Sequence, residues 1–255
     1  MIERISLRAA ALALALACFA AQPARAAEDA ATTIDPAQRQ AIEEIVRDYI
    51  MKNPEIVIEA LDAMRERERI AREDRAREAL TSFGTDLFDN PASPTMGNPD
   101  GDIVVVEFFD YRCGYCRRMF EPVMELVESD GEIRFVLKEF PILGPESVFA
   151  ARAALASRKQ DLYDPFHSAM MMAEVGLGES TILAIAESVG LDTDRLRADM
   201  EDPAIDEELA RNFQMADALA IEGTPGYVIG EDIIRGAISM ERFQGYIDKV
   251  RDGAS

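Results

Sequence analysis

The sequence predicts an α/β domain preceded by an α-helical segment. Residues 103–109 form a run of β-branched and aromatic side chains with one glutamate, which is typical of a buried strand. A helix-compatible run follows from Arg117 to Ser129. Before this domain, residues 35–64 place apolar side chains at helical spacing, which predicts amphipathic helices.

Residues 1–26 have the pattern of a secretory signal. Positive charge at the start precedes an apolar run, Ala9–Ala21, and small residues stand at the cleavage positions 24–26. The run is shorter than the ~20 residues of a membrane span. A lipoprotein signal at Cys18 is the alternative. We expect cleavage after Ala26 and export to the periplasm, where disulfides persist.

Residues 27–95 are expected to form a helical oligomerisation segment with a linker. Asp35-Pro36 predicts a helix start, and Asn53-Pro54 separates two amphipathic helices. Residues 65–78 are mostly charged, which is typical of a solvated helix. Two short helices bury little apolar surface against each other. We therefore expect a homo-oligomer; the alternative is that the segment folds back on its own domain.

Two cysteines follow the predicted strand as C-x-x-C, at Cys113 and Cys116. One helical turn brings such residues onto one face, close enough to bridge. At a helix N-terminus, unpaired N–H groups and the positive dipole end favour a thiolate. Cys113 is thus the predicted nucleophile, with a lowered thiol pKa, and Cys116 the resolving thiol. This is the thioredoxin-type redox arrangement.

Zinc binding and a purely structural disulfide are the alternatives at this motif. A structural zinc site normally needs four ligands. After signal cleavage no third cysteine remains, and the chain has a single histidine, His167. A disulfide across two residues constrains the unfolded chain little. Redox chemistry is therefore favoured, and thiol–disulfide exchange needs no metal or organic cofactor beyond the Cys113–Cys116 disulfide.

Two segments carry a resemblance to a known family. Residues 107–116 resemble the active-site segment of DsbA-like bacterial thiol–disulfide oxidoreductases. Residues 223–228, Gly-Thr-Pro-Gly-Tyr-Val, resemble the cis-proline loop of that family. The resemblance implies that residues 96–255 form a thioredoxin-fold catalytic domain, with a helical insertion at about 161–220.

The resemblance also implies roles for individual residues. A cis Pro225 would hold its loop beside the disulfide, where an extended substrate pairs with it by strand addition. Thr224 would contact the Cys113 sulfur, and Gly223 would share the substrate site with Thr224. Gly114 and Tyr115, between the cysteines, would also meet substrate. The alternative for residues 224–225 is an ordinary trans turn.

Glu107 interrupts the apolar strand six residues before Cys113. A buried carboxylate is costly and tends to have a raised pKa. By the resemblance it would assist proton movement to the deeper cysteine, with Lys138 as a candidate partner. The alternative is a structural acid in the strand. For Met170–Met172 we favour core and groove lining over metal binding, because consecutive helical positions point in different directions. A lone helical histidine such as His167 is more often packed or exposed than a proton carrier.

The overall layout is similar to the suppressor-of-copper-sensitivity C-type proteins, whose helical extension makes trimers. That resemblance favours a trimer, with a dimer as the alternative. Gly114-Tyr115 and Thr224 resemble isomerase members of the family more than the oxidase, whose dipeptide is typically Pro-His.

The sequence thus predicts a periplasmic enzyme, a protein disulfide isomerase or reductase. A DsbA-type dithiol oxidase and an oligomeric holdase-like binding protein are the alternatives. Expected partners are unfolded or misoxidised exported proteins and a membrane redox partner. The net charge of -21 argues against nucleic acid as a partner.

Overall fold

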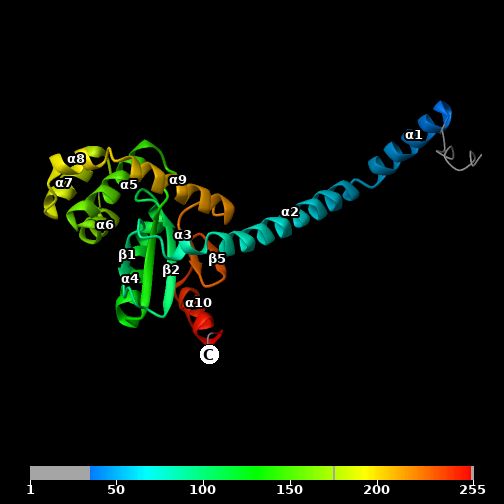
Figure 1. Ribbon diagram of the computed structural model, residues 1–255. Helices are drawn as coiled ribbons and strands as arrows, with labels where there is room; N and C mark the ends of the chain where they lie inside the picture. The colour runs from blue at the N-terminus through cyan, green and yellow to red at the C-terminus, as the bar shows by residue number, and fades with distance from the viewer. Residues whose placement is uncertain (1–34, 175, 254–255) are drawn as a thin grey trace, which may run out of the picture. The chain divides into compact units, whose positions relative to one another are not determined.

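The computed structural model describes residues 35–174 and 176–253, and the chain divides into two compact units at Met64–Arg65 (Figure 1). The predicted signal at residues 1–26 lies outside the described residues. None of the described helices has the length and apolarity needed to cross a membrane.

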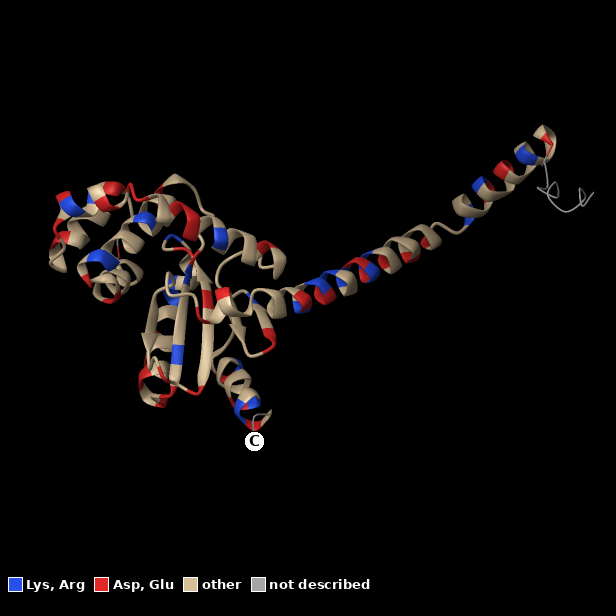
Figure 2. Cartoon of the chain, viewed as in Figure 1, with Lys and Arg blue, Asp and Glu red and all other residues tan. Residues whose placement is uncertain are grey.

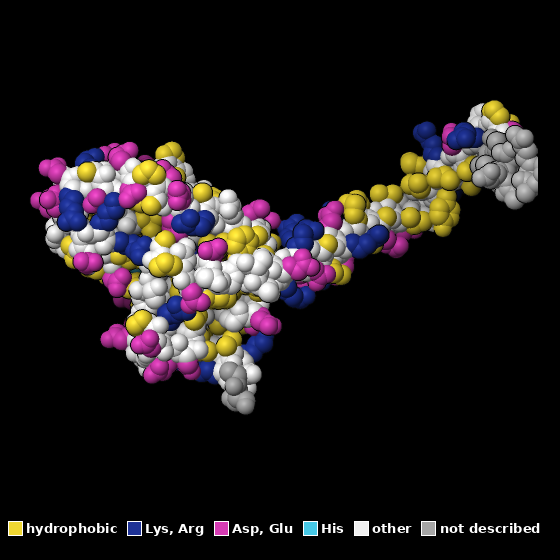
Figure 3. Space-filling view, in the orientation of Figure 1, with side chains coloured by type: hydrophobic (Ala, Val, Ile, Leu, Met, Phe, Trp, Pro, Cys, Tyr) yellow, Lys and Arg dark blue, Asp and Glu magenta, His cyan; other side chains and the backbone are white. Residues whose placement is uncertain are grey.

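The first unit contains α1 (Pro36–Lys52) and the start of α2 (Glu55–Ser82). Asp35 caps α1 as predicted, because its side chain accepts hydrogen bonds from the backbone N–H groups of Ala37 and Gln38 at 2.8 and 3.0 Å. No residue of α1 is buried. Figure 3 shows hydrophobic side chains gathered along this unit, and the larger exposed ones are Ile42, Ile45, Val46, Tyr49, Ile50, Met51, Val57, Ile58, Leu61 and Met64.

The second unit is built on a mixed five-stranded sheet. Its strands run in the order β1-β3-β2-β4-β5, with β2 and β3 parallel and the other pairs antiparallel. The strands are β1 (Thr95–Gly97), β2 (Ile103–Phe109), β3 (Ile133–Glu139), β4 (Gly226–Ile229) and β5 (Asp232–Arg235). The hairpin of β4 and β5 turns at Gly230, whose φ of 58° is one that glycine adopts readily.

Helices cover both faces of this sheet and form a separate block between β3 and β4 (Figure 1). Within the described part of residues 161–220, four α-helices occupy the predicted insertion, and α6 packs on α4. The helices of the unit are α3 (Gly84–Phe88), α4 (Gly114–Asp130), α5 (Pro145–Ser157), the 3₁₀ turn η1 (Arg158–Gln160), α6 (Tyr163–Met172), α7 (Glu179–Ser188), α8 (Thr193–Asp199), α9 (Pro203–Ala218) and α10 (Met240–Gly253).

Alternation along the strands separates two apolar cores, one on each face of the sheet. Val105 and Phe109 of β2 point into the core that contains the two cysteines. Val106 and Phe108 point into the second core, which α2, α3 and α9 cover. The same alternation of side chains determines on which face of the sheet each polar residue of a strand lies.

The second half of α2 belongs to the second unit, which differs from the division expected at residue 95. Its face Ala76, Ala79 and Leu80 is buried, and the last two pack in the core with Val106 and Phe108. The charged side chains of residues 65–78 surround this narrow apolar stripe, and Figure 2 shows them alternating in sign along α2. The apolar residues of this stripe recur at helical spacing, so the sequence contains an amphipathic pattern in addition to its many charged residues.

Replacing Leu87 tests whether residues 65–95 are part of the folded catalytic unit. Leu87 of α3 is fully buried in the second core, so Leu87→Ala should lower the free energy of unfolding by about 2–5 kcal/mol. The control Ile70→Ala, at an exposed position of α2, should change it by less than about 0.5 kcal/mol. Urea unfolding of both variants measures the difference; equal small effects would contradict this assignment.

Candidate active site

The two cysteines stand at the start of α4, as the sequence predicts. Cys113 is the N-cap residue, and its Sγ accepts a hydrogen bond from the backbone N–H of Cys116 at 3.4 Å. Cys113 is 6% exposed and Cys116 is fully buried. Both are free thiols in the structure. The outer sulfur is therefore the one that a substrate meets first.

The surroundings push the pKa values of the two thiols apart. The pKa of Cys113 is lowered to about 5, chiefly by a hydrogen bond from the Cys116 side chain. Its partial burial opposes this, while the Thr224 side chain and the backbone N–H groups of Cys116 and Tyr115 add to it. Burial raises the pKa of Cys116 far above its ordinary value. At neutral pH the site therefore holds one thiolate and one thiol.

The Thr224–Pro225 peptide bond is cis, and its loop lies against Cys113. The carbonyl oxygen of Thr224 is 3.2 Å from the Cys113 Sγ. The predicted proximity of these two segments is confirmed, although they are far apart in the chain. Gly226, just after the proline, has no room for a side chain, because a Cβ would stand 2.5 Å from the Ile221 side chain.

The three other predicted substrate-contacting residues are exposed around the sulfur. Gly114 begins α4, and Gly223 directly precedes Thr224. Tyr115 is 60% exposed, and the Arg118 guanidinium lies 4.4 Å from the centre of its ring. An aromatic surface thus stands next to the thiolate, where a polypeptide can pack on it.

Glu107 is buried on the same face of the sheet as the cysteines. It pairs across the strands with Tyr227 of β4. Burial raises the pKa of Glu107 to about 8; the Tyr227 hydroxyl partly opposes the shift and the Cys113 charge adds to it. The Glu107 charge in turn raises the pKa of Cys116. Glu107 is thus a titratable group coupled to the resolving thiol, which is the position that the proton role requires.

The suggested pairing of Glu107 with Lys138 is wrong. Lys138 pairs in register with Phe108, so its side chain points to the opposite face of the sheet. Its Nζ donates to the carbonyl oxygen of Asp86 and to the Ser93 hydroxyl, both at 2.6 Å. Ser93 in turn donates to Glu208 at 2.8 Å. Sequence position alone does not distinguish the two faces until the register is known.

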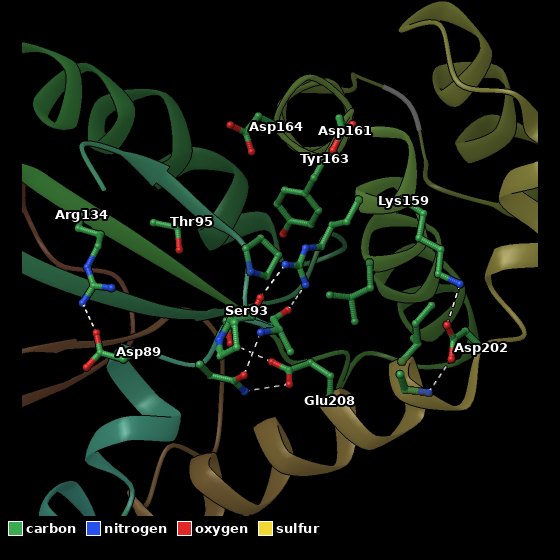
Figure 4. A pocket seen from close by; sticks show the side chains of 18 of the residues that line it. Asp89, Ser93, Thr95, Arg134, Lys159, Asp161, Tyr163, Asp164, Asp202 and Glu208 are labelled. Atoms are coloured by element: carbon green, nitrogen blue, oxygen red, sulfur yellow. Dashed lines mark hydrogen bonds and ion pairs between the residues drawn. The ribbon is translucent and has the colours of Figure 1, made fainter. Parts of the chain in front are cut away.

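Ser93 and Glu208 line a cavity of about 830 Å³ between residues 88–95 and the helical block (Figure 4). The cavity contains none of the predicted site residues. Many of its charged side chains are paired with neighbours: Arg134 binds Asp89, and Lys159 binds Asp202, both at 2.7 Å. The predicted site residues therefore lie outside this cavity.

Asp110 holds the turn before Cys113, a role that the sequence analysis did not assign. Its buried carboxylate accepts hydrogen bonds from the backbone N–H groups of Arg112 and Leu143, at 2.8 and 3.0 Å, and from the Ser147 hydroxyl at 2.8 Å. Its carbonyl oxygen accepts from the Cys113 N–H at 2.9 Å. An aspartate that accepts from the N–H two residues on is a recognisable turn signal, so this role was open to prediction.

A second buried group connects the turn to the helical block. The Tyr111 and Tyr163 hydroxyls donate to Glu139 at 3.0 and 2.9 Å, and Tyr111 lies 2.8 Å from Nδ1 of His167. Burial lowers the pKa of His167 to about 3, so its imidazole is neutral at physiological pH, and burial raises the pKa of Glu139 well above its ordinary value. The packing role favoured for His167 agrees with this position. Among the described residues no cluster of candidate metal ligands is present.

Comparison with known families gives two matches. The family described as DSBA-like thioredoxin domain matches residues 104–248. The family described as Copper resistance protein ScsC N-terminal domain matches residues 38–71. The first match contains both cysteines and the cis proline, and the second lies on α1 and the start of α2.

Solved structures and curated proteins are similar to the chain. A thioredoxin-like oxidoreductase from Silicibacter pomeroyi DSS-3 is 43% identical, covering 66% of this chain and 97% of that one, with a TM-score of 0.65. Proteus mirabilis ScsC in a transitional conformation is 29% identical, covering 85% and 96%, with a TM-score of 0.62. "Probable disulfide bond formation protein D" of Bacillus anthracis is 25% identical, covering 62% of this chain and 82% of its own length.

Other curated relatives are much longer than the matched region. The chain covers only 28% of the Na(+)/H(+) antiporter NhaA of Herminiimonas arsenicoxydans, at 26% identity over 172 residues.

The ionisation of Cys113 can be measured directly. Thiolate absorbance near 240 nm in the reduced protein should titrate with a midpoint of about pH 5. In Cys116→Ala the midpoint should rise, because the largest stabilising hydrogen bond to the thiolate is lost. A wild-type midpoint close to that of a free thiol would contradict the proposed arrangement.

The raised pKa of Glu107 makes a prediction for stability against pH. A carboxyl whose folded pKa is above its unfolded value stabilises the fold at low pH, and this contribution is lost as pH rises through the folded pKa. Between about pH 4.5 and about pH 8, wild type should therefore lose about 4 kcal/mol relative to Glu107→Gln. Urea unfolding of the oxidised proteins, in which neither thiol titrates, measures this. A pH-independent difference would show that Glu107 is not buried as described.

Proposed function

Because the chain belongs to the family of DSBA-like thioredoxin domains, we propose that it is a periplasmic protein thiol–disulfide oxidoreductase acting on exported proteins. The observation that carries this proposal is the contact of the cis-proline loop with the outer sulfur, with Thr224 O 3.2 Å from the Cys113 Sγ. A thiolate at that point faces a backbone able to hold an extended polypeptide.

The exchange proceeds in two balanced steps. The Cys113 thiolate attacks one sulfur of a substrate disulfide, forming a mixed disulfide and releasing the other substrate sulfur as a thiolate. Cys116 then loses its proton and attacks the Cys113 Sγ. The substrate leaves with two reduced sulfurs, and Cys113 and Cys116 are oxidised to a disulfide. Glu107, whose charge is coupled to Cys116, is the group that accepts the proton.

Isomerisation or reduction is the direction that we favour. In isomerisation a second thiol of the substrate, in place of Cys116, attacks the mixed disulfide, and Cys113 returns to the thiolate. A low Cys113 pKa keeps that thiolate populated at neutral pH. The same stabilisation makes the oxidised form a better oxidant, so a dithiol oxidase of the DsbA type is the second candidate. Gly114-Tyr115 and Thr224 support the first.

Homo-oligomerisation through the first unit is part of the proposal. The apolar side chains of α1, among them Val46 and Ile50, are exposed in the single chain. An amphipathic helix with no covered face calls for a partner surface. The ScsC N-terminal domain match over residues 38–71 supports a second copy as that surface. We favour a trimer over a dimer from the resemblance in layout alone. Several thiolates near one substrate would raise their effective concentration.

The cellular setting is also proposed. Residues 1–26 support export, and the oxidising periplasm is where such an exchange is useful. An isomerase or reductase must be kept reduced, so a membrane redox partner is expected. An oligomeric holdase-like binding protein remains the alternative from another class, favoured by the exposed apolar side chains of α1. Replacing both cysteines by serine separates them, since only an enzyme would lose its activity.

The oligomer and the direction of exchange can be tested together. Val46→Glu places a charge on the apolar face of α1, and Gln40→Glu places the same charge on its polar face. Val46→Glu should reduce the mass in solution to that of one chain and slow the refolding of scrambled ribonuclease by about 10-fold or more. Reduction of a small-molecule disulfide should be unchanged.

Gln40→Glu should behave as wild type in each assay. If Val46→Glu keeps both its mass and its isomerisation rate, the apolar face of α1 is not an oligomer contact. Faster oxidation of reduced ribonuclease than isomerisation of the scrambled form by wild type would favour the oxidase instead.

A further inference from the structure

A cleft of about 540 Å³ separates helix α2 from the cis-proline loop within the second unit. Resting on the proposed function, we infer that this cleft binds a polypeptide substrate next to its reacting cysteine and prefers acidic side chains there. It is lined by Arg65, Glu68, Arg69, Arg72, Glu73, Ala220, Glu222, Gly223, Thr224, Arg235 and Gly236.

The cleft opens beside the reacting sulfur. Thr224 lines it, and the carbonyl oxygen of the same residue is 3.2 Å from the Cys113 Sγ. A substrate cysteine joined to Cys113 must therefore place the neighbouring part of its chain within reach of the cleft. The opposite wall of the cleft is α2. Residues 65–78, which the sequence predicts to be a solvated helix, therefore form part of the substrate-binding surface.

The loop side of the cleft presents unused main-chain groups. The backbone N–H groups of Glu222, Gly223 and Thr224 have no hydrogen-bond partner within residues 35–174 and 176–253. Glu222 and Gly223 are exposed, and Gly223 has open space where a side chain would stand. Unpaired N–H groups in an accessible loop can receive the carbonyl oxygens of an extended chain. Because these N–H groups suit main-chain carbonyl oxygens, we assign a polypeptide, and not a small disulfide, as the molecule that binds in the cleft.

The side chains of the cleft favour negative charge. Four arginines and three glutamates line it, and Arg69 is bound by Glu66 and Glu73, so the excess positive charge of the cleft rests on Arg235. Arg235 donates hydrogen bonds to the carbonyl oxygens of Leu219 and Ala220, which are neutral groups and leave its positive charge uncompensated. Bidentate contacts make arginine well suited to carboxylates.

One ion pair crosses the cleft and is open to exchange. Arg72 of α2 binds Glu222 of the loop at 3.0 Å, and both side chains are more than half exposed. Exposed pairs of this kind contribute about 0–1 kcal/mol. A substrate carboxylate can therefore take the place of Glu222 on Arg72 at little cost, whereas a substrate lysine at the same point would be repelled.

Charge reversal on α2 tests this inference. The substrates are three peptides with one disulfide whose cysteine is flanked by Glu, Gln or Lys, and the measured quantity is kcat/KM for reduction. Wild type should prefer the Glu peptide over the Lys peptide by about 5-fold, as expected for a contribution of about 1 kcal/mol. Arg72→Glu should remove or invert the preference, and 0.5 M salt should weaken it.

The matched control is Arg77→Glu, an exposed position on the same helix outside the cleft lining, where Arg77 binds Asp74 at 3.2 Å. It should keep the wild-type preference. Bis(2-hydroxyethyl) disulfide, uncharged and without a peptide backbone, should be reduced equally by wild type and Arg77→Glu. Loss of that activity in wild type would overturn the proposed function. An intact activity with no charge preference in wild type, or the same preference in Arg72→Glu, would overturn only the cleft inference.

Discussion

The stabilisation of a thiolate on Cys113 is the interaction on which the rest of the site depends. It comes from hydrogen bonds donated by the Cys116 side chain, the Thr224 side chain and the backbone at the start of α4. Burial has the opposite effect on Cys116, because it raises the pKa of this thiol and keeps it protonated. Two chemically identical side chains one helical turn apart thus become a nucleophile and a reserve thiol. Their environments, and not their identity, assign the roles.

This arrangement requires the turn before Cys113 to be rigid, and buried hydrogen bonds to the turn supply that rigidity. Asp110 fixes the turn to the loop after β3 through the N–H of Leu143, and to α5 through the Ser147 hydroxyl. Tyr111 fixes it to Glu139 and His167. The helical block therefore contributes to the active site through α6, although it supplies neither cysteine. Its insertion between β3 and β4 leaves the sheet order intact and adds a support for the turn.

The sequence predicted the chemistry better than the boundaries. A strand followed by C-x-x-C has few physical interpretations, so the positions of Cys113 and Cys116 followed from local rules. The facing of Lys138 depends on strand register, which the sequence alone does not reveal. Residues 65–78 are so rich in charge that their composition predicts a solvated helix, yet Ala76 and Leu80 of the same helix are buried. Here the spacing of the apolar residues predicts burial better than the composition does. The contacts among Tyr111, Glu139 and His167 join three segments that are far apart in the sequence, so no local sequence pattern predicts them.

His167, Glu139 and Glu107 are ionisable residues buried near the dithiol, and their pKa values differ. His167 has a pKa lowered to about 3, below the range where thiols exchange, and burial raises the pKa of Glu139 well above its ordinary value. The hydrogen bonds from Tyr111 and Tyr163 offset part of the cost of burying Glu139. Glu107 differs, because its pKa of about 8 lies within that range and its charge is coupled to Cys116. A carboxyl that ionises at the pH of the reaction can take a proton and return it. The contacts of His167 and Glu139 with Tyr111 hold the turn before Cys113, and Glu107 is the residue to which we assign the proposed proton transfer.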